Sequence, residues 1–161
     1  MKNKIDLVDF VEEQINERYK AFIIIVNILT FTKELIDKIV SNANGSHIDL
    51  IEMFNNNSEL ANRIDVFNSD DLKELLKNLE YDSEIIFVSG IDLLWNVWND
   101  FEKNRFLKMI EKNTISSPIS NKVYCFFMYK DPITSQLNLY NTYGRSRAIP
   151  IDQFVLRGNV R

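Results

Sequence analysis

The sequence has few of the residues that build covalently linked or metal-held frameworks. Its 161 residues include one cysteine, Cys125, and one histidine, His47. A single cysteine excludes an intrachain disulfide framework and any site with several thiolate ligands. A single histidine argues against a zinc or iron site built from imidazole side chains. We therefore expect this chain to hold neither a metal ion nor a cofactor.

Glycine, proline and long apolar runs are also scarce. Four glycines and three prolines exclude collagen-like and proline-rich architectures. The longest apolar run, Ala21–Val26, falls far short of the roughly 20 residues that span a bilayer. The start, Met1–Leu7, lacks the apolar stretch and cleavage site of a signal peptide. We expect a cytoplasmic protein without a membrane partner.

What remains is the composition of an ordinary globular domain. Apolar residues make up 45% of the chain and charged residues 26%, and 161 residues suit one domain better than two. No repeat, linker or low-complexity tract interrupts the sequence, so we predict a single domain over residues 1–161. The abundance of isoleucine (20) and asparagine (19), which AT-rich codons serve, is typical of an AT-rich bacterium or a mobile element.

Charge is divided unevenly along the chain. Residues 1–102 carry 9 Lys/Arg against 20 Asp/Glu, a net charge of −11, and residues 103–161 carry 10 against 3, a net charge of +7, so the sum is −4. The basic part could form a nucleic-acid surface. Alternatively, the acidic face of one copy could meet the basic face of another. In a third interpretation, the two parts intermix in the fold and the separation disappears.

The pattern of apolar residues predicts strands that alternate with helices. Unbroken apolar runs, typical of strands buried on both faces of a parallel sheet, occur at Ala21–Val26, Glu84–Val88 and Lys122–Tyr129. A short strand is predicted at His47–Leu50. Helices are predicted over 4–19, 32–42 (with a C-terminal stop at Asn42–Gly45), 57–64, 70–79 and 91–112, the last broken near 99–100. Residues 137–156 are predicted to form a terminal hairpin. The sequence therefore predicts an α/β domain with a mainly parallel, helix-covered sheet.

The turn after the first buried strand occupies the place where nucleotide-binding α/β proteins cradle phosphate. A working phosphate loop reads G-x-x-x-x-G-K-[ST]. Here Asn27 and Thr32 stand at the glycine positions, Lys33 stands at the lysine position, and Glu34 replaces the hydroxyl. Glycines let such a turn bring its N–H groups against phosphate, and the bulky side chains at 28, 29 and 31 oppose that geometry. We predict a turn that cannot wrap a triphosphate.

The second buried strand ends without the carboxylate that holds magnesium in a working ATPase. It ends in Ser89-Gly90, and the first acidic residue is Asp92. Asp92 either joins Lys33 in an unorthodox nucleotide site or serves the next helix as its N-cap or first-turn residue, and we favour the second role. Together, Asn27, Thr32, Lys33 and Asp92 are predicted to form a vestigial nucleotide pocket.

The order of these segments resembles that of a known family. The phosphate-loop-like turn is followed by Asn57–Arg63 (NSELANR), Asp70–Leu76 (DDLKELL), Ile85–Trp95 (IIFVSGIDLLW) and Phe106–Ile110 (FLKMI). This order is similar to that of the BrxF family of small P-loop proteins in type 3 BREX anti-phage systems, over roughly residues 20–130, with Ile91–Trp95 as the most specific segment. The resemblance implies a three-layer P-loop-NTPase-like domain and a role in defence beside a larger protein subunit. Because the phosphate-loop glycines, the Ser/Thr and the Walker B Asp are absent, the ATP binding of the family is not carried over.

The basic C-terminal part interleaves aromatic rings with positive charges, as single-strand nucleic-acid binders do. The residues that would form this nucleic-acid or partner surface are Lys122, Lys130, Tyr140, Tyr143, Arg145, Arg147 and Arg157. The alternative is a hairpin in water with ordinary surface charge. Similarly, Trp95, Trp98 and Phe101 form a helical stripe that either anchors a partner or belongs to the core.

The sequence does not assemble residues for covalent catalysis. Cys125 lies in mid-strand among aromatic residues, which is typical of an inert buried thiol, and no G-x-S-x-G motif occurs. We therefore predict a non-enzyme: an accessory or adaptor subunit of a prokaryotic anti-phage defence (BREX-like) or mobile-element complex, which binds a larger ATPase or DNA-modifying protein. The alternative is a nucleic-acid-binding module that uses residues 103–161. DNA and a second copy of the chain are the further candidate partners.

Overall fold

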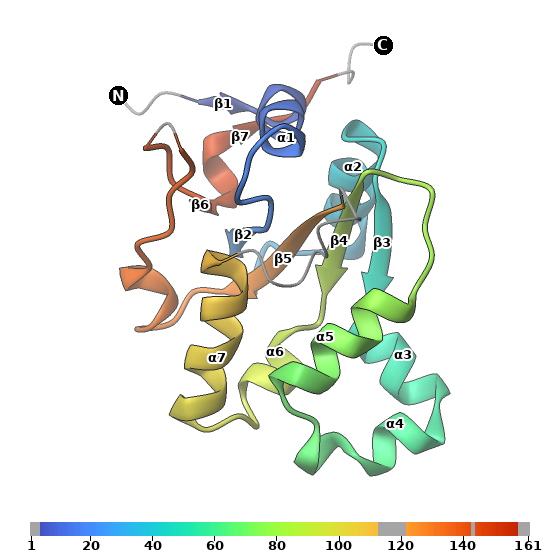
Figure 1. The fold of residues 1–161 in the computed structure, drawn as a ribbon. Helices are drawn as coiled ribbons and strands as arrows, with labels where there is room; N and C mark the ends of the chain where they lie inside the picture. The colour runs from blue at the N-terminus through green and yellow to red at the C-terminus, as the bar shows by residue number, and fades with distance from the viewer. Residues whose placement is uncertain (1–3, 113–121, 143, 158–161) are drawn as a thin grey trace.

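The computed structural model describes residues 4–112, 122–142 and 144–157, which form an α/β fold around a parallel sheet (Figure 1). Five strands lie in the order β3-β4-β5-β2-β6, and every pairing between them is parallel. Their bounds are β2 Phe22–Val26, β3 Ser46–Asp49, β4 Ile85–Ser89, β5 Val123–Tyr129 and β6 Ala148–Pro150. The predicted parallel sheet is confirmed, as are the three strands that the unbroken apolar runs predicted.

The central strands are buried on both faces, which explains their unbroken apolar sequences. β2 lies between β5 and β6, with Ile24 opposite Phe127 on one side and Ile149 on the other. All three of these side chains are almost fully buried. The sheet therefore passes through the interior, with a hydrophobic core on each of its faces.

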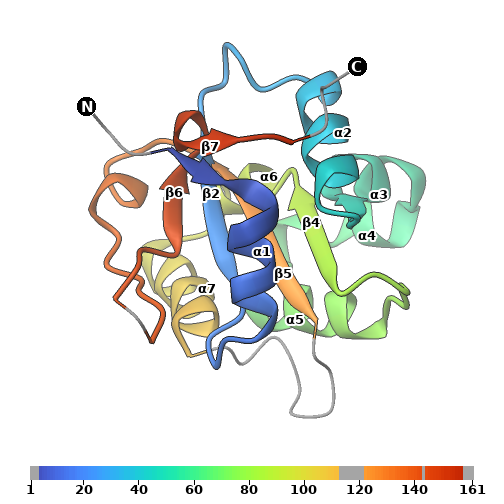
Figure 2. The ribbon, with the colours of Figure 1, turned by 90° about the horizontal axis from the view of Figure 1, so that it is seen from above.

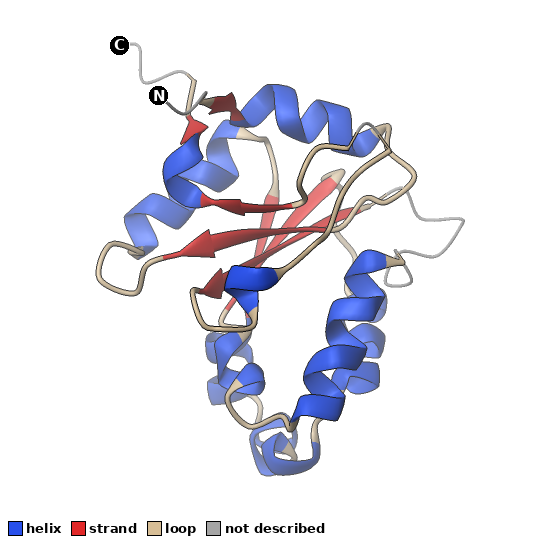
Figure 3. Ribbon diagram, turned by 90° about the vertical axis from the view of Figure 1, so that its left-hand side faces the viewer, coloured by secondary structure: helices blue, strands red, loops and turns tan. Residues whose placement is uncertain are grey.

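Helices cover both faces of the sheet, so the fold has three layers (Figure 3). Their bounds are α1 Leu7–Ile15, α2 Lys33–Asn42, α3 Leu50–Asn56, α4 Ser58–Asn62, α5 Ser69–Asn78, α6 Asp92–Trp95 and α7 Asp100–Glu111. On the face of α1 and α2, the ring centroids of Phe10 and Phe22 lie 5.0 Å apart. On the face of α3, α5, α6 and α7, those of Phe106 and Phe126 lie 5.1 Å apart. No helix in the described ranges is long and apolar enough to cross a membrane.

Local sequence signals set both ends of α2. It begins after Thr32, whose hydroxyl accepts a hydrogen bond from the Leu35 N–H (3.2 Å). It ends where Asn44 adopts a φ of 52° and the Gly45 N–H donates to the Val40 carbonyl (2.9 Å). The predicted stop at 42–45 is confirmed.

Two other helix boundaries bear on the predictions. α1 begins later than the predicted residue 4, because Ile5 and Asp6 form β1, which pairs in parallel with β7 (Phe154–Val155), and it ends at Ile15, before the predicted residue 19. Asp6 also caps α1 by accepting a hydrogen bond from the Asp9 N–H (3.0 Å). The predicted break near 99–100 is confirmed, since Asn99 caps the start of α7.

The C-terminal segment differs from the predicted terminal hairpin. An antiparallel bridge joins Tyr140 to Ser146, but the chain then enters β6, which lies parallel to β2, and β7, which lies parallel to β1 (Figure 2). The physical reason is that β2 is central and has backbone groups to satisfy on both of its edges. The segment therefore completes the second edge of β2 and ties the end of the chain to its beginning.

Candidate functional site

The residues of the predicted nucleotide pocket all lie at the carboxyl edge of the sheet. β2 leads into α2 on one face, whereas β4 leads into α6 on the other, so a topological switch point lies between them. Open α/β sheets bind ligands at such a point. The structure brings the turn at 27–32, Lys33 at the start of α2 and Asp92 at the start of α6 to this edge.

Asn27 closes the turn after β2 with three hydrogen bonds. Its Oδ1 accepts from the Leu29 N–H (2.9 Å), and its carbonyl accepts from the N–H groups of Thr30 (3.1 Å) and Phe31 (2.9 Å). In a phosphate loop, successive N–H groups of this kind face the anion. Here Asn27 already satisfies these three donors, so they are not available to phosphate while the turn keeps this conformation.

The tip of this turn is apolar and exposed. Ile28 is 66% exposed and Leu29 is 87% exposed. Phe31 anchors the turn, since its ring centroid lies 4.9 Å from that of Phe127 and 6.4 Å from that of Tyr129. Figure 2 shows the turn standing out from the rest of the fold between β2 and α2. An anchored turn thus presents two large aliphatic side chains to solvent.

A histidine–serine pair lies beside the start of α2. The Nε2 atom of half-buried His47 on β3 lies 2.7 Å from the hydroxyl oxygen of Ser89 on β4. Burial lowers the pKa of His47 and outweighs the opposing carboxylates of Asp49 and Asp37, whereas Lys33 adds to the lowering. Burial therefore favours the neutral form of the imidazole. Sequence reasoning missed this pair because it forms across two neighbouring strands.

Asp92 is a first-turn residue of α6, as predicted, and its carboxylate also reaches β5. The Tyr129 N–H donates toward this carboxylate, with the nitrogen 3.4 Å from each oxygen. Burial raises the pKa of Asp92 to about 6, and the neighbouring Asp131 adds to the rise. Burial therefore disfavours the charged form of this carboxylate, which is the form that binds magnesium.

Asp131 is a second carboxylate at this edge, and the sequence analysis did not single it out. Its Oδ1 accepts from the N–H groups of Ile133 and Thr134 (both 2.8 Å), and its Oδ2 accepts from Trp95 Nε1 (2.7 Å). Burial alone would raise the pKa of Asp131, but these hydrogen bonds outweigh it and lower the pKa. An Asp just after a strand with a Thr three residues later is the local signal of such a turn.

Arg147 does not lie on the predicted basic surface, because it is 1% exposed. Its guanidinium donates to four backbone carbonyls, those of Tyr140 (3.0 Å), Ala21 (2.8 Å), Ile110 (2.9 Å) and Glu111 (3.1 Å). These carbonyls belong to the approach to β2, the end of α7 and the C-terminal segment. Arg147 therefore connects three parts of the fold from within the core. The prediction that it lies on a nucleic-acid or partner surface is wrong.

Two more arginines of the predicted basic surface pair with the acidic N-terminal part. Arg145 lies 3.0 Å from a carboxylate oxygen of Glu13 on α1. Arg157 lies 2.9 Å from a carboxylate oxygen of Asp6 and also pairs with Asp9. The hydrogen bond from Arg157 lowers the pKa of Asp6. The acidic and basic parts of the sequence thus pack together, as the third interpretation of the charge pattern predicted.

The remaining members of that predicted surface are dispersed. Lys122 donates to the Ser83 carbonyl (2.6 Å), on the approach to β4. Lys130 and Tyr140 are exposed, and Tyr143 lies outside the described residues. The structure therefore does not gather the predicted set on one face.

The two tryptophans of the predicted aromatic stripe belong to the core. Trp95 and Trp98 are almost fully buried, and their rings lie 6.3 Å and 5.5 Å from that of Phe106, between centroids. Phe101 is exposed. Cys125 is buried in β5, and burial raises the pKa of its thiol, as expected for an inert cysteine.

Comparisons with known proteins place the chain in no family: none of the models of protein families matches it, and neither does any curated protein.

Proposed function

We propose that this chain is a non-catalytic accessory protein that binds a larger protein, an ATPase or a DNA-modifying subunit, in a prokaryotic anti-phage defence (BREX-like) or mobile-element complex. The observation that carries the proposal is the turn after β2, where Asn27 occupies three backbone donors and Ile28 and Leu29 face solvent. The three-layer α/β scaffold agrees with the resemblance to the BrxF family. The defence setting comes from that resemblance.

Binding a triphosphate at this edge would require the turn to open. The three hydrogen bonds to Asn27 would have to break, at a cost of roughly 1 kcal/mol each, before their donors could reach phosphate. Glu34 in the first turn of α2 also places negative charge beside a helix N-terminus that would otherwise attract an anion. Both features favour a turn that keeps its own contacts.

The same edge suits a protein partner. Burying Ile28 and Leu29 would stabilise a complex by about 1.5–3 kcal/mol for each side chain. A third exposed aliphatic side chain, Ile51, lies near the start of α3, which follows β3 at this edge. Acidic side chains accompany these residues, at Glu34 on α2 and Glu52 on α3. We therefore expect a partner surface with an apolar centre and a basic rim.

Co-purification from the native host tests this proposal. The tagged wild-type chain is expected to retain a partner whose gene lies beside its own. The double variant Ile28→Asp, Leu29→Asp is expected to lose that partner, because it would bury two unpaired charges. A matched control, Ala61→Asp with Val66→Asp, adds the same charge at exposed positions elsewhere and is expected to retain it. Retention of the partner by the first variant, or a rise in melting temperature with Mg-ATP, would contradict the proposal.

Fewer observations support the alternative, nucleic-acid binding through residues 103–161. Arg147 is buried, and Arg145 and Arg157 pair with carboxylates, whereas Lys130 and Tyr140 stay exposed. A steep fall in DNA affinity with added salt would favour this alternative. The absence of a band shift on an electrophoretic gel at low salt would eliminate it.

A further inference from the structure

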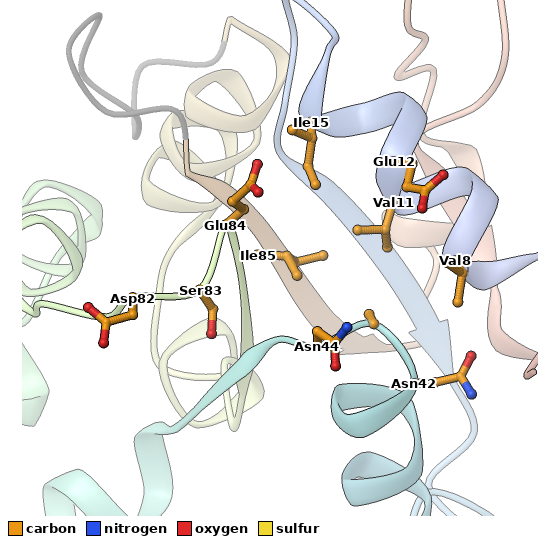
Figure 4. A pocket seen from close by; sticks show the side chains of 11 residues that line it. Val8, Val11, Glu12, Ile15, Asn42, Asn44, Asp82, Ser83, Glu84 and Ile85 are labelled. Carbon is orange, nitrogen blue, oxygen red and sulfur yellow. The ribbon is translucent and has the colours of Figure 1, made fainter. Parts of the chain in front are cut away.

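A hollow of about 390 Å³ opens between α1, the end of α2 and the approach to β4 (Figure 4). Its apolar wall consists of Val8, Val11 and Ile15 on α1 and Ile85 at the start of β4. In Figure 4 the side chains of Val11, Ile15 and Ile85 point into the space between these elements. The hollow lies where β3 and β4 begin, at the amino edge of the sheet, and is therefore separate from the turn that carries Ile28 and Leu29.

The side chains around this wall are acidic. Glu12 on α1 and Asp82 and Glu84 before β4 line the hollow, and none of the described residues that line it is a lysine or an arginine. Figure 4 shows Glu12 and Glu84 on either side of Ile15, whereas the Asp82 carboxylate turns outward. A negative rim around an apolar wall favours a ligand that is positively charged and partly aliphatic.

The space does not end at this hollow. A second, more open hollow, which shares Val8 and Asn42 with the first, continues between α1 and α2 past Asp37 and Lys38. The shared lining makes one groove along α1, which suits an extended ligand better than a compact one. Arg157 lines this second hollow but is already paired with Asp6.

We propose that this α1–α2 groove binds a cationic amphipathic segment of a protein partner. An aliphatic side chain of the segment would pack against Val8 and Ile15, the partly exposed members of the wall, and a lysine or arginine would meet Glu12 and Glu84. The volume lies in the range of specific ligand sites, and a helix that places its apolar face in a groove is a common mode of protein recognition. The carboxylates of the first hollow repel phosphate, which disfavours nucleic acid there. This site is additional to the surface of the proposed function.

Methyl-resolved NMR of the full chain tests the groove with a defined probe, an amphipathic lysine–leucine peptide. We expect saturable shifts of the Val8 and Ile15 methyl resonances, which weaken with added salt because the rim attracts through charge. A glutamate–leucine peptide of equal length is expected to leave these resonances unchanged. The variant Ile28→Asp, Leu29→Asp is expected to keep the shifts, so this proposal and the proposed function can fail separately.

Charge variants separate the groove from general attraction to an acidic protein. Glu12→Lys with Glu84→Lys is expected to weaken peptide binding by roughly tenfold or more. The matched pair Glu59→Lys with Glu74→Lys, at exposed positions on α4 and α5, makes the same change in net charge and is expected to alter binding by less than about twofold. Each variant is checked by its methyl spectrum for an intact fold.

Four results would overturn the proposal. Equal losses in the two pairs of variants would show attraction to overall charge. Equal shifts with spermine would show a site for small cations. Binding of the glutamate–leucine peptide would show an apolar site without charge selection. Methyl shifts that depend on protein concentration without any peptide would show that a second copy of the chain occupies the groove.

Discussion

The two edges of the central sheet differ in what they offer to a ligand. At the carboxyl edge, polar groups satisfy one another: Asn27 holds the turn after β2, and Asp131 accepts hydrogen bonds from Trp95 and from two backbone N–H groups. At the amino edge, an apolar hollow with an acidic rim opens beside α1. Parallel α/β sheets bind ligands at the carboxyl edge. The fold therefore sets where such an edge lies, whereas individual side chains decide whether that edge can bind a ligand.

The largest expected effect on stability comes from replacing Arg147, the buried arginine at the amino edge of the sheet, just before β6. Arg147→Met removes the guanidinium that donates to four carbonyls, among them those of Ala21 before β2 and Ile110 on α7. We expect the free energy of unfolding to fall by about 3 kcal/mol or more, because these buried acceptors lose a charged partner. Urea denaturation followed by circular dichroism measures the change.

Arg145→Met is the control. It removes an exposed ion pair with Glu13 and is expected to cost less than about 1 kcal/mol. Similar losses in the two variants would contradict an internal role for Arg147.

A smaller effect on stability is expected when the turn after β2, at the carboxyl edge, loses one hydrogen bond. Asn27→Ala removes the oxygen that accepts from the Leu29 N–H, so we expect the free energy of unfolding to fall by about 1 kcal/mol. Asn27→Asp keeps an acceptor at the same position and is expected to stay within about 0.5 kcal/mol of the wild type. Hydrogen exchange of the Leu29 amide should become faster in Asn27→Ala alone. An unchanged exchange rate would show that Asn27 does not close the turn.

The smallest expected effect is a pH dependence of stability that arises from Asp92 at the carboxyl edge. The folded-state pKa of Asp92, about 6, lies above its ordinary value of 3.8. The folded state therefore binds the Asp92 proton more tightly than the unfolded state does. Protonation of Asp92 thus stabilises the fold fully below about pH 4, and this stabilisation is lost as pH rises through about 6. Asp92→Asn keeps an acceptor for the Tyr129 N–H and removes the titration.

Urea midpoints of the wild type and Asp92→Asn at about pH 5 and about pH 7.5 measure this effect. We expect the variant to gain on the wild type as pH rises, by less than about 1 kcal/mol because the carboxyl group is only partly buried. A difference between the two proteins that is the same at both pH values would contradict the raised pKa.

Much of the fold could be predicted from local sequence. A strand buried on both faces needs no polar position, so Phe22–Val26 and Ile85–Ser89 were recognisable as apolar runs. The helix α3 was missed because seven residues, Leu50–Asn56, give little periodicity. The parallel pairing of β6 was missed because three residues, Ala148–Pro150, carry little information about register, and packing on β2 selects their partner.

The site was predictable in position but not in its contacts. The spacing of Lys33 after a buried strand was enough to locate the turn at the carboxyl edge. The burial of Arg147 was not predictable, since arginine is almost always exposed and three of its four acceptors lie 36 to 126 residues earlier in the chain. The hydrogen bond between Trp95 and Asp131 was not predictable either, because Trp95 lies 36 residues earlier in the chain.

The closed carboxyl edge is tested most directly by the amide NMR resonances of its turn during a titration with Mg-ATP. We predict that the Leu29, Thr30 and Phe31 resonances do not move at millimolar nucleotide, because Asn27 already holds their N–H groups. Saturable shifts of these three resonances would contradict a turn that is closed to phosphate.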